Sequence, residues 1–171
     1  MDESLQVAIE LHEYTWNGFK KDLEDVTTEE ANWRPVAEAN TINLIVRHLR
    51  IDTPWHVRNV GNNDRGQEAD TTSQAADPVP LDFERNLREL DELYTTFIGA
   101  LRNMTLDGLE RQSGRAYRDA GQGSAPRHFL GFHLAVHLAR HWGQVRTLRN
   151  LYCKTRGAPA RFFPDNPSFP Q

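Results

Sequence analysis

Four segments of the sequence place apolar residues at the spacing of an amphipathic α-helix, and no segment shows the sustained alternation of a β-strand. The segments are residues 2–26, 41–60 and 81–104, and a last one that begins at Ser124 or Pro126 and continues to about Tyr152. An amphipathic helix must bury its apolar stripe against other elements. The sequence therefore predicts an all-α fold, a four-helix bundle with long connecting loops, in which residues 1–171 form a single domain.

The connecting segments contain the usual signals that start and stop helices. The pair Asn40–Thr41 supplies a cap for the second helix, and Pro54 inside that helix predicts a kink. The polar stretches 61–80 and 105–124 are expected to be surface loops. Residues 157–171 contain four prolines, so we expect an extended tail on the surface of the bundle or on a partner subunit.

The composition excludes several classes of function. The formal net charge is −4, and interspersed basic and acidic residues provide no patch that would attract nucleic acid or an anionic membrane. No apolar run approaches the ~20 residues that cross a bilayer, and the acidic start of the chain is unlike a secretory signal. The single cysteine, Cys153, rules out an intramolecular disulfide and a cysteine-based zinc cluster. We therefore expect a cytoplasmic protein without nucleic-acid or membrane partners, acting on a small molecule.

Three histidines stand at intervals of four in the last predicted helix: His133, His137 and His141. Residues four apart are neighbours on a helix and can share one metal ion. His133 and His141 lie about 12 Å apart along the axis, which is too far for both to bind the same ion. The metal-binding pair is therefore 133/137 or 137/141. The apolar arc of this helix favours 137/141, because His141 falls in its middle and His133 lies outside it.

The second predicted helix carries polar residues on the face that should be buried. His48, Asp52 and His56 share that face with apolar residues, which conflicts with simple patterning and is typical of a functional site. Asp52 is expected either to bind a metal or to orient an imidazole through its free N–H. The opposite face is expected to be a solvent-exposed stripe of Asn43, Arg47, Arg50 and Arg58.

The histidines of different helices together favour a metal site over isolated core histidines. A single histidine on an apolar face is more often a hydrogen-bonded core residue. A pair at i and i+4, joined by an inward histidine on another helix, favours a site of His48, His137 and His141. His12, in the centre of the apolar arc of the first helix, is also expected to reach a central site. The HExxH pattern and the Glu-x-x-His pairs of di-iron bundles are absent, which argues against those chemistries.

Two stretches resemble the DinB-like superfamily of metal-dependent bundles. NWRPVAEANTINLIVRHL is similar to its "WRP…S/T-I…L…H" motif, and HLARHWGQ is similar to its "H-x-x-x-H-R-G-Q" motif, with Trp142 in the usual arginine position. The resemblance covers the first, second and fourth helices, and the third only as a generic pattern. It implies a mononuclear site with ligands His48, His137 and His141. Members of this superfamily include mycothiol-dependent maleylpyruvate isomerases and bacillithiol transferases, and homodimers are common among them.

Three imidazole ligands leave at least one coordination position open, as in catalytic zinc sites. A divalent metal there lowers the pKa of bound water or deprotonates a bound thiol. Our leading hypothesis is a thiol S-transferase that uses a low-molecular-weight thiol, with Asp52, His12 and Gln144 as supporting residues. The alternatives are a metal-dependent hydrolase and a non-enzymatic dimeric bundle that binds a metal or small ligand. The donor set does not select among zinc, nickel, iron and manganese.

Overall fold

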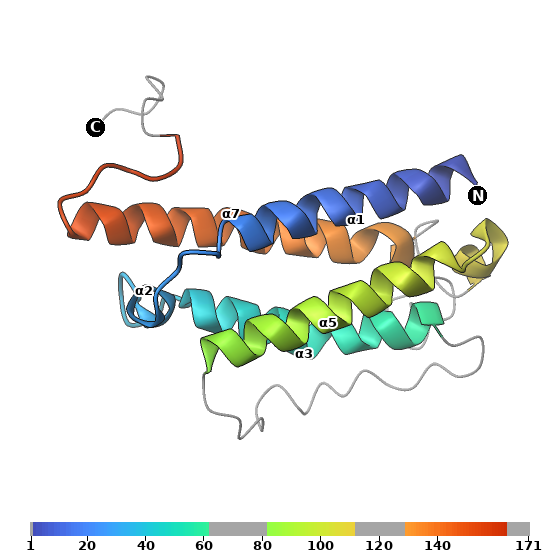
Figure 1. The fold of residues 1–171 in the computed structure, drawn as a ribbon, viewed down its shortest axis with the longest axis horizontal. Coiled ribbons are helices and arrows are strands. Elements are labelled where there is room, and N and C mark those ends of the chain that lie inside the picture. Colours follow the sequence, from blue (N-terminus) through green and yellow to red (C-terminus); the bar gives the residue numbers. More distant parts are fainter. Residues whose placement is uncertain (1, 62–81, 112–128, 164–171) are drawn as a thin grey trace.

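The computed structural model describes residues 2–61, 82–111 and 129–163. Its helices include four long ones and a short one, namely α1 (Glu3–Lys21), α2 (Thr28–Asn32), α3 (Ile42–Gly61), α5 (Phe83–Arg102) and α7 (Phe129–Thr155) (Figure 1). These ranges contain no β-strand, so the predicted all-α bundle fold is confirmed. The predicted start of the last helix at Ser124 or Pro126, and most of the two long loops, lie outside the described residues.

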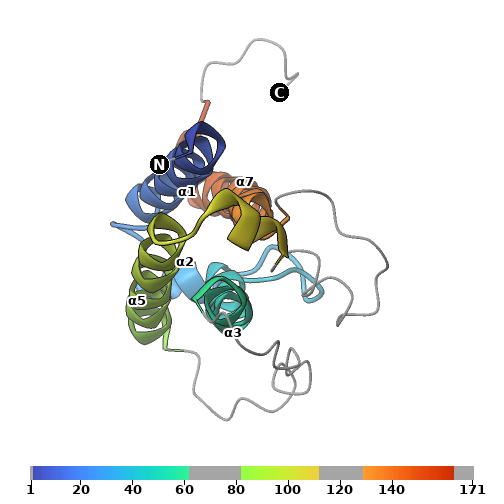
Figure 2. The same cartoon turned by 90° about the vertical axis from the view of Figure 1, so that its right-hand side faces the viewer.

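The four long helices pack around one core in two close pairs. α3 packs most extensively on α5 and α1 on α7, while α3 also contacts α7 and α1 contacts α5 (Figure 2). The largest fully buried side chains of the core include Phe19, Leu49, Leu90, Tyr94, Phe97 and Leu101. None of the described helices combines the length and apolar character needed to cross a membrane.

The predicted first helix, residues 2–26, is in fact shorter, and a second short helix follows it. Asp2 caps α1 by accepting a hydrogen bond from the backbone N–H of Ser4 at 2.9 Å, and α1 ends at Lys21. The hydroxyl of Thr27 accepts the backbone N–H of Glu30 at 3.2 Å and caps α2. A threonine followed three residues later by glutamate is a helix-start signal that the apolar pattern alone had concealed.

The second predicted helix has the expected start but not the expected exposed stripe. Thr41 caps α3, since its hydroxyl accepts the backbone N–H of Leu44 at 3.1 Å, and the helix is continuous through Pro54. Asn43, predicted to face solvent, is completely buried. Its Nδ2 donates to Oδ1 of Asn32 at 3.0 Å, and its Oδ1 accepts from Nδ2 of Asn86 at 3.3 Å. That prediction was wrong, because α2 and α5 cover this face and satisfy the amide there.

Helix α7 approaches α1 closely where a glycine lacks a side chain. A Cβ atom added to Gly18 would lie 2.2 Å from the indole of Trp142, so only glycine leaves room for this ring. The indole Nε1 of Trp142 donates to Oδ2 of Asp22 at 2.5 Å. Trp142 therefore sets the distance and rotation of α7 against α1, and its neighbour His141 is held with it.

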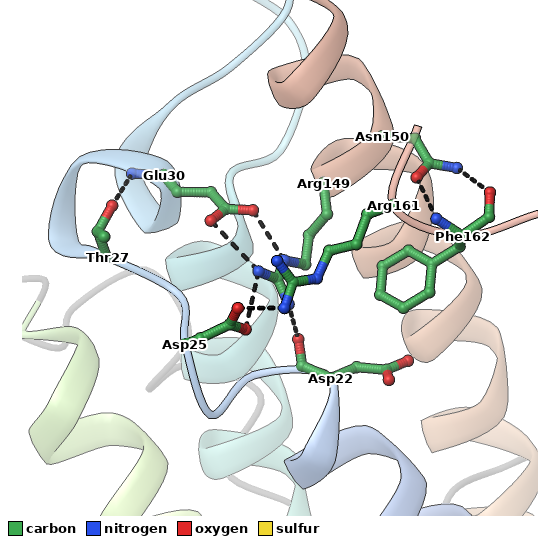
Figure 3. A network of polar contacts seen from close by, with 8 residues as sticks. All are labelled: Asp22, Asp25, Thr27, Glu30, Arg149, Asn150, Arg161 and Phe162. Carbon is green, nitrogen blue, oxygen red and sulfur yellow. Dashed lines mark hydrogen bonds and ion pairs between the residues drawn. The ribbon is translucent and has the colours of Figure 1, made fainter. Parts of the chain in front are cut away.

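A buried arginine joins α7 to α2 and to the segment between α1 and α2 (Figure 3). The side chain of Arg149 is 1% exposed, and its Nε donates to Oε1 of Glu30 at 2.7 Å. Its other nitrogens contact the backbone carbonyl of Asp22 and, at 3.0 Å, Oδ1 of Asp25. Residues 157–163 of the predicted tail lie against this end of the bundle, where Asn150 exchanges two hydrogen bonds with the backbone of Phe162.

Candidate metal centre

Three histidines from two helices point their Nε2 atoms at one another. His48 lies on α3, and His137 and His141 lie one turn apart on α7. Nε2 of His137 is 3.1 Å from Nε2 of His48 and 2.9 Å from Nε2 of His141. The candidate ligand atoms of all three residues lie within 4.8 Å of one another, and all three side chains are half-buried. The contact between α3 and α7 thus brings together the three histidines predicted from the sequence.

Two neighbouring oxygen atoms orient the two imidazoles of α7. Oδ2 of Asp52 lies 3.1 Å from Nδ1 of His137, and Oε1 of Gln144 lies 2.7 Å from Nδ1 of His141. An ionised carboxylate and an amide oxygen only accept hydrogen bonds, so both contacts favour the tautomer with the proton on Nδ1. Each Nε2 is then left with a lone pair that faces the centre of the cluster.

The arrangement of these nitrogens fits a metal ion better than an internal hydrogen bond. With protons on Nδ1, the Nε2 atoms of His137 and His141 have no proton to share across their 2.9 Å separation, and their lone pairs repel. Ligands of a tetrahedral zinc ion at about 2.0–2.1 Å stand about 3.3 Å from one another, which is close to the separations found here. The donor set therefore fits a divalent transition metal.

The protonation states at the site also suit metal binding. Burial, together with the neighbouring His137, lowers the pKa of His48, and burial lowers the pKa of His141 against the opposing hydrogen bond from Gln144. Burial by itself raises the pKa of Asp52, but its contacts with His137 and His56 hold that pKa well below its ordinary value. The imidazoles of His48 and His141 are thus favoured as neutral bases and Asp52 as a carboxylate, the forms that metal ligation and its orientation require.

His56 and His133 flank the cluster without joining it. The His133 ring stacks on His56 at 5.2 Å and on His137 at 6.0 Å, measured between centroids. Nε2 of His56 lies 3.6 Å from Oδ2 of Asp52. Burial, helped by His56 and His137, lowers the pKa of His133 to about 4. Of the two pairs left open by the sequence, the structure groups 137/141 with His48 and leaves His133 beside them.

His12 has a different environment from the one predicted for it. It is completely buried, and its Nε2 donates to the backbone carbonyl of Gly131 at 2.9 Å. Its ring packs edge-on against Phe97, with centroids 4.9 Å apart. The position of His12 on the apolar arc was therefore correct, but its hydrogen bond is to the backbone of α7, and it does not belong to the group of converging ligand atoms.

A pocket opens directly onto two of the three histidines. Its volume is about 340 Å³, and it is lined by Asn40, Leu44, Ile45, Arg47, His48, Ile51 and His141. Sequence reasoning missed Arg47 here, because it placed that residue on an exposed stripe. A long arginine side chain can lie along apolar surface and bring its charged end to a neighbouring face of the helix. Adjacency to His48 was the only signal in the sequence that could have indicated this.

The comparisons with known proteins bear on the same residues. A family model described as mycothiol S-transferase matches residues 11–153, a range that includes α3, the described part of α7 up to Cys153 and the whole histidine cluster. This family is a member of the DinB-like superfamily, so the resemblance noted in the sequence is confirmed. No curated protein and no solved structure matched the chain significantly.

Proposed function

Because this chain belongs to the mycothiol S-transferase family, we propose that it is a metal-dependent thiol S-transferase whose metal is held by His48, His137 and His141. The observation that carries this proposal is the convergence of three Nε2 atoms, two of which belong to rings, those of His137 and His141, that Asp52 and Gln144 orient from behind. Three protein ligands leave room for a further ligand, which is a requirement of a catalytic site.

A divalent metal bound here would supply the Lewis acidity that keeps a small thiol deprotonated near neutral pH. His48, His137 and His141 would hold the metal, and Asp52 and Gln144 would keep the rings of His137 and His141 in the ligating tautomer. In the overall reaction the sulfur of the thiolate forms a bond to an electrophilic carbon. The leaving group departs with the electron pair of the broken bond, and the proton of the thiol passes to solvent. The family supports mycothiol as the thiol.

The test combines metal analysis with thiol-dependent turnover. We expect one equivalent of a divalent transition metal per chain in the wild type, and conversion of a model electrophile only when a low-molecular-weight thiol is added. His48→Ala should lose both the metal and the turnover. His133→Gln is the matched control, because His133 lies beside the cluster but outside its ligand group, and this variant should retain the metal.

Other outcomes would contradict the proposal in distinguishable ways. Turnover that does not depend on an added thiol would indicate the metal-dependent hydrolase. Wild-type protein without stoichiometric metal, with a stability unchanged by His48→Ala, would contradict the metal site itself. The single domain, the homodimer and the cytoplasmic location remain predictions; the mass of the particle in solution measures the second of these.

A further inference from the structure

We infer that His56 is a positioning residue of the metal site: it holds the carboxylate of Asp52 against His137 and so keeps that imidazole in the orientation that binds the metal. This inference rests on the proposed metal site and adds a residue to it. His56 does not belong to the group of converging ligand atoms, so it acts through Asp52.

One carboxylate oxygen lies between two imidazole rings. Oδ2 of Asp52 is 3.1 Å from Nδ1 of His137 on α7 and 3.6 Å from Nε2 of His56 on α3. Asp52 and His56 stand four residues apart on α3, so their side chains are neighbours on one face of that helix. The second separation is longer than a direct hydrogen bond, so this contact is an electrostatic attraction between an N–H group and the carboxylate. The same oxygen is therefore drawn towards both rings.

The surroundings of His56 favour the tautomer that this attraction requires. The side chain is 1% exposed, and its Nδ1 has no hydrogen-bond partner among the described residues. A neutral imidazole carries one ring proton, and the carboxylate of Asp52 lies on the side of Nε2. The proton is therefore favoured on Nε2, where it faces the negative charge of Asp52.

Side chains from two other helices fix the ring of His56. Phe97 of α5 meets it edge-on at 6.3 Å, and His133 of α7 stacks on it at 5.2 Å, measured between ring centroids. A side chain packed in this way keeps one rotamer. The side chain of Asp52 is 30% exposed, so by itself it has room to turn from His137 towards water. A rigid donor beside a partly exposed carboxylate restricts that freedom, and this is how His56 affects a metal bound by its neighbours.

A purely structural role accounts less well for a histidine at this position. Burying an imidazole costs free energy relative to an apolar side chain unless a polar partner compensates for the lost water. Asp52 is the polar partner that the structure gives to His56. If His56 only filled space in the core, an aromatic or aliphatic side chain would do so at a lower cost.

The first measurement is the affinity for zinc, obtained on the purified full-length protein by competition with a chromophoric chelator. His56→Phe keeps a flat ring but removes the N–H, and it should weaken zinc binding by about three- to fivefold. His56→Gln loses the ring, but its amide N–H donates from about the same place as Nε2, so it should stay within about twofold of the wild type. His12→Gln is the matched control, because His12 is equally buried but donates to the Gly131 carbonyl, and this variant should bind zinc as the wild type does.

A double-mutant cycle tests whether the effect passes through Asp52. In an Asp52→Ala background, His56→Phe should change the zinc affinity by less than about twofold, since the carboxylate that His56 holds is gone. The thermal transition is recorded for every variant, and His56→Leu replaces His56→Phe if the latter does not fold. Three results would each overturn the inference: no loss in the variant without the N–H, equal losses in that variant and in His56→Gln, or a loss that persists without Asp52.

The second measurement requires no metal. In metal-free protein at about pH 8, above the ordinary histidine pKa near 6.5, ¹⁵N chemical shifts distinguish protonated from unprotonated ring nitrogens. His137 of the wild type should carry its proton on Nδ1, and His56→Phe should show a mixture of the two tautomers. An unchanged His137 spectrum in that variant would contradict the positioning role. If the wild type binds no zinc, the proposed metal site fails, while the tautomer of His137 still tests what His56 does.

Discussion

Helix α7 contributes to two polar clusters that are built on opposite principles. Towards its C-terminal end, Arg149 meets Glu30 and Asp25, so a buried cation is surrounded by complementary anions (Figure 3). Burial by itself lowers the pKa of Arg149, but the hydrogen bonds and charges of these carboxylates raise that pKa above its ordinary value. About two to three turns earlier, His141 and His137 meet His48, and three groups of the same kind face one another.

The difference shows which of the two clusters finds all of its interaction partners among the residues of the chain. Glu30 and Asp25 already satisfy Arg149, so that cluster requires no ligand and serves to join α7 to the segment after α1. In the histidine cluster the carboxylate of Asp52 lies behind His137, and the imidazole nitrogens of three residues face one another rather than a side chain of opposite charge. A half-buried group of like donors that face one another is the arrangement expected of a binding site.

The largest expected effect is the loss of the buried ion pair. Arg149→Met leaves Glu30 as an unpaired buried carboxylate, which should lower the free energy of unfolding by about 3–5 kcal/mol. Equilibrium urea denaturation measures this. The exposed pair of Arg156 and Glu29 is the control, and Arg156→Met should cost no more than about 1 kcal/mol. Equal costs for the two variants would contradict the distinction between a buried and an exposed pair.

His12 tests whether a buried histidine whose hydrogen-bond partner lies within the chain contributes to stability rather than to metal binding. Burial, together with the neighbouring His56, lowers the pKa of His12 to about 4, despite the opposing hydrogen bond to the Gly131 carbonyl. The unfolded chain, with an ordinary pKa near 6.5, therefore binds more protons than the folded chain between these values. The stability contributed by neutral His12 is complete above about pH 6.5 and is lost as the pH falls towards 4, by up to about 3 kcal/mol.

The measurement is urea denaturation of metal-free protein between pH 7.5 and 4.5, for the wild type and for His12→Gln. The variant should lose part of the pH dependence in this window while retaining its metal affinity. If His12→Gln also lost metal binding, His12 would support the metal site, which would contradict the purely structural role inferred from its hydrogen bond to Gly131.

Metal removal should affect the histidine cluster and leave the arginine cluster unchanged. A metal that binds only the folded state stabilises it by about 2.7 kcal/mol at a hundredfold excess over its dissociation constant. Chelation should therefore lower the melting temperature of the wild type but not that of His137→Ala. Arg149→Met should respond to chelation as the wild type does. A variant without His137 that is still stabilised by metal would contradict the assigned ligand set.

The smallest effects are expected for the residues behind the ligands. Asp52→Asn keeps the volume of the side chain but removes the charge beside Nδ1 of His137, and it should weaken metal binding by about 10–100-fold. Gln144 is exposed, so Gln144→Ala should weaken metal binding less than Asp52→Asn does. Competition with a chromophoric chelator measures both affinities, and a larger effect at Gln144 would contradict this order.

Helix periodicity predicted the parts of this protein that depend on spacing within one helix. It located the four long helices, and it separated His133 from His141 because eight residues span too long a rise for one ion. It could not predict α2, whose five residues have too few turns to show a period; the capping residues Thr27 and Glu30 were its only signal. Asn43 was misplaced for a related reason, since the amides that bury it come from α2 and α5.

The sequence by itself therefore determined the fold class and the family, and it reduced the histidines of α7 to two candidate pairs with 137/141 favoured, because each of these depends on residues close together along the chain. Only the tertiary structure decided how the helices are rotated against one another. That rotation, set by contacts such as Trp142 against Gly18, brings His48 and Asp52 to the α7 histidines. It also turns His12 to a backbone carbonyl and brings Arg47 to the pocket. The physical reason is that side-chain packing between helices, rather than spacing within one helix, sets which faces meet.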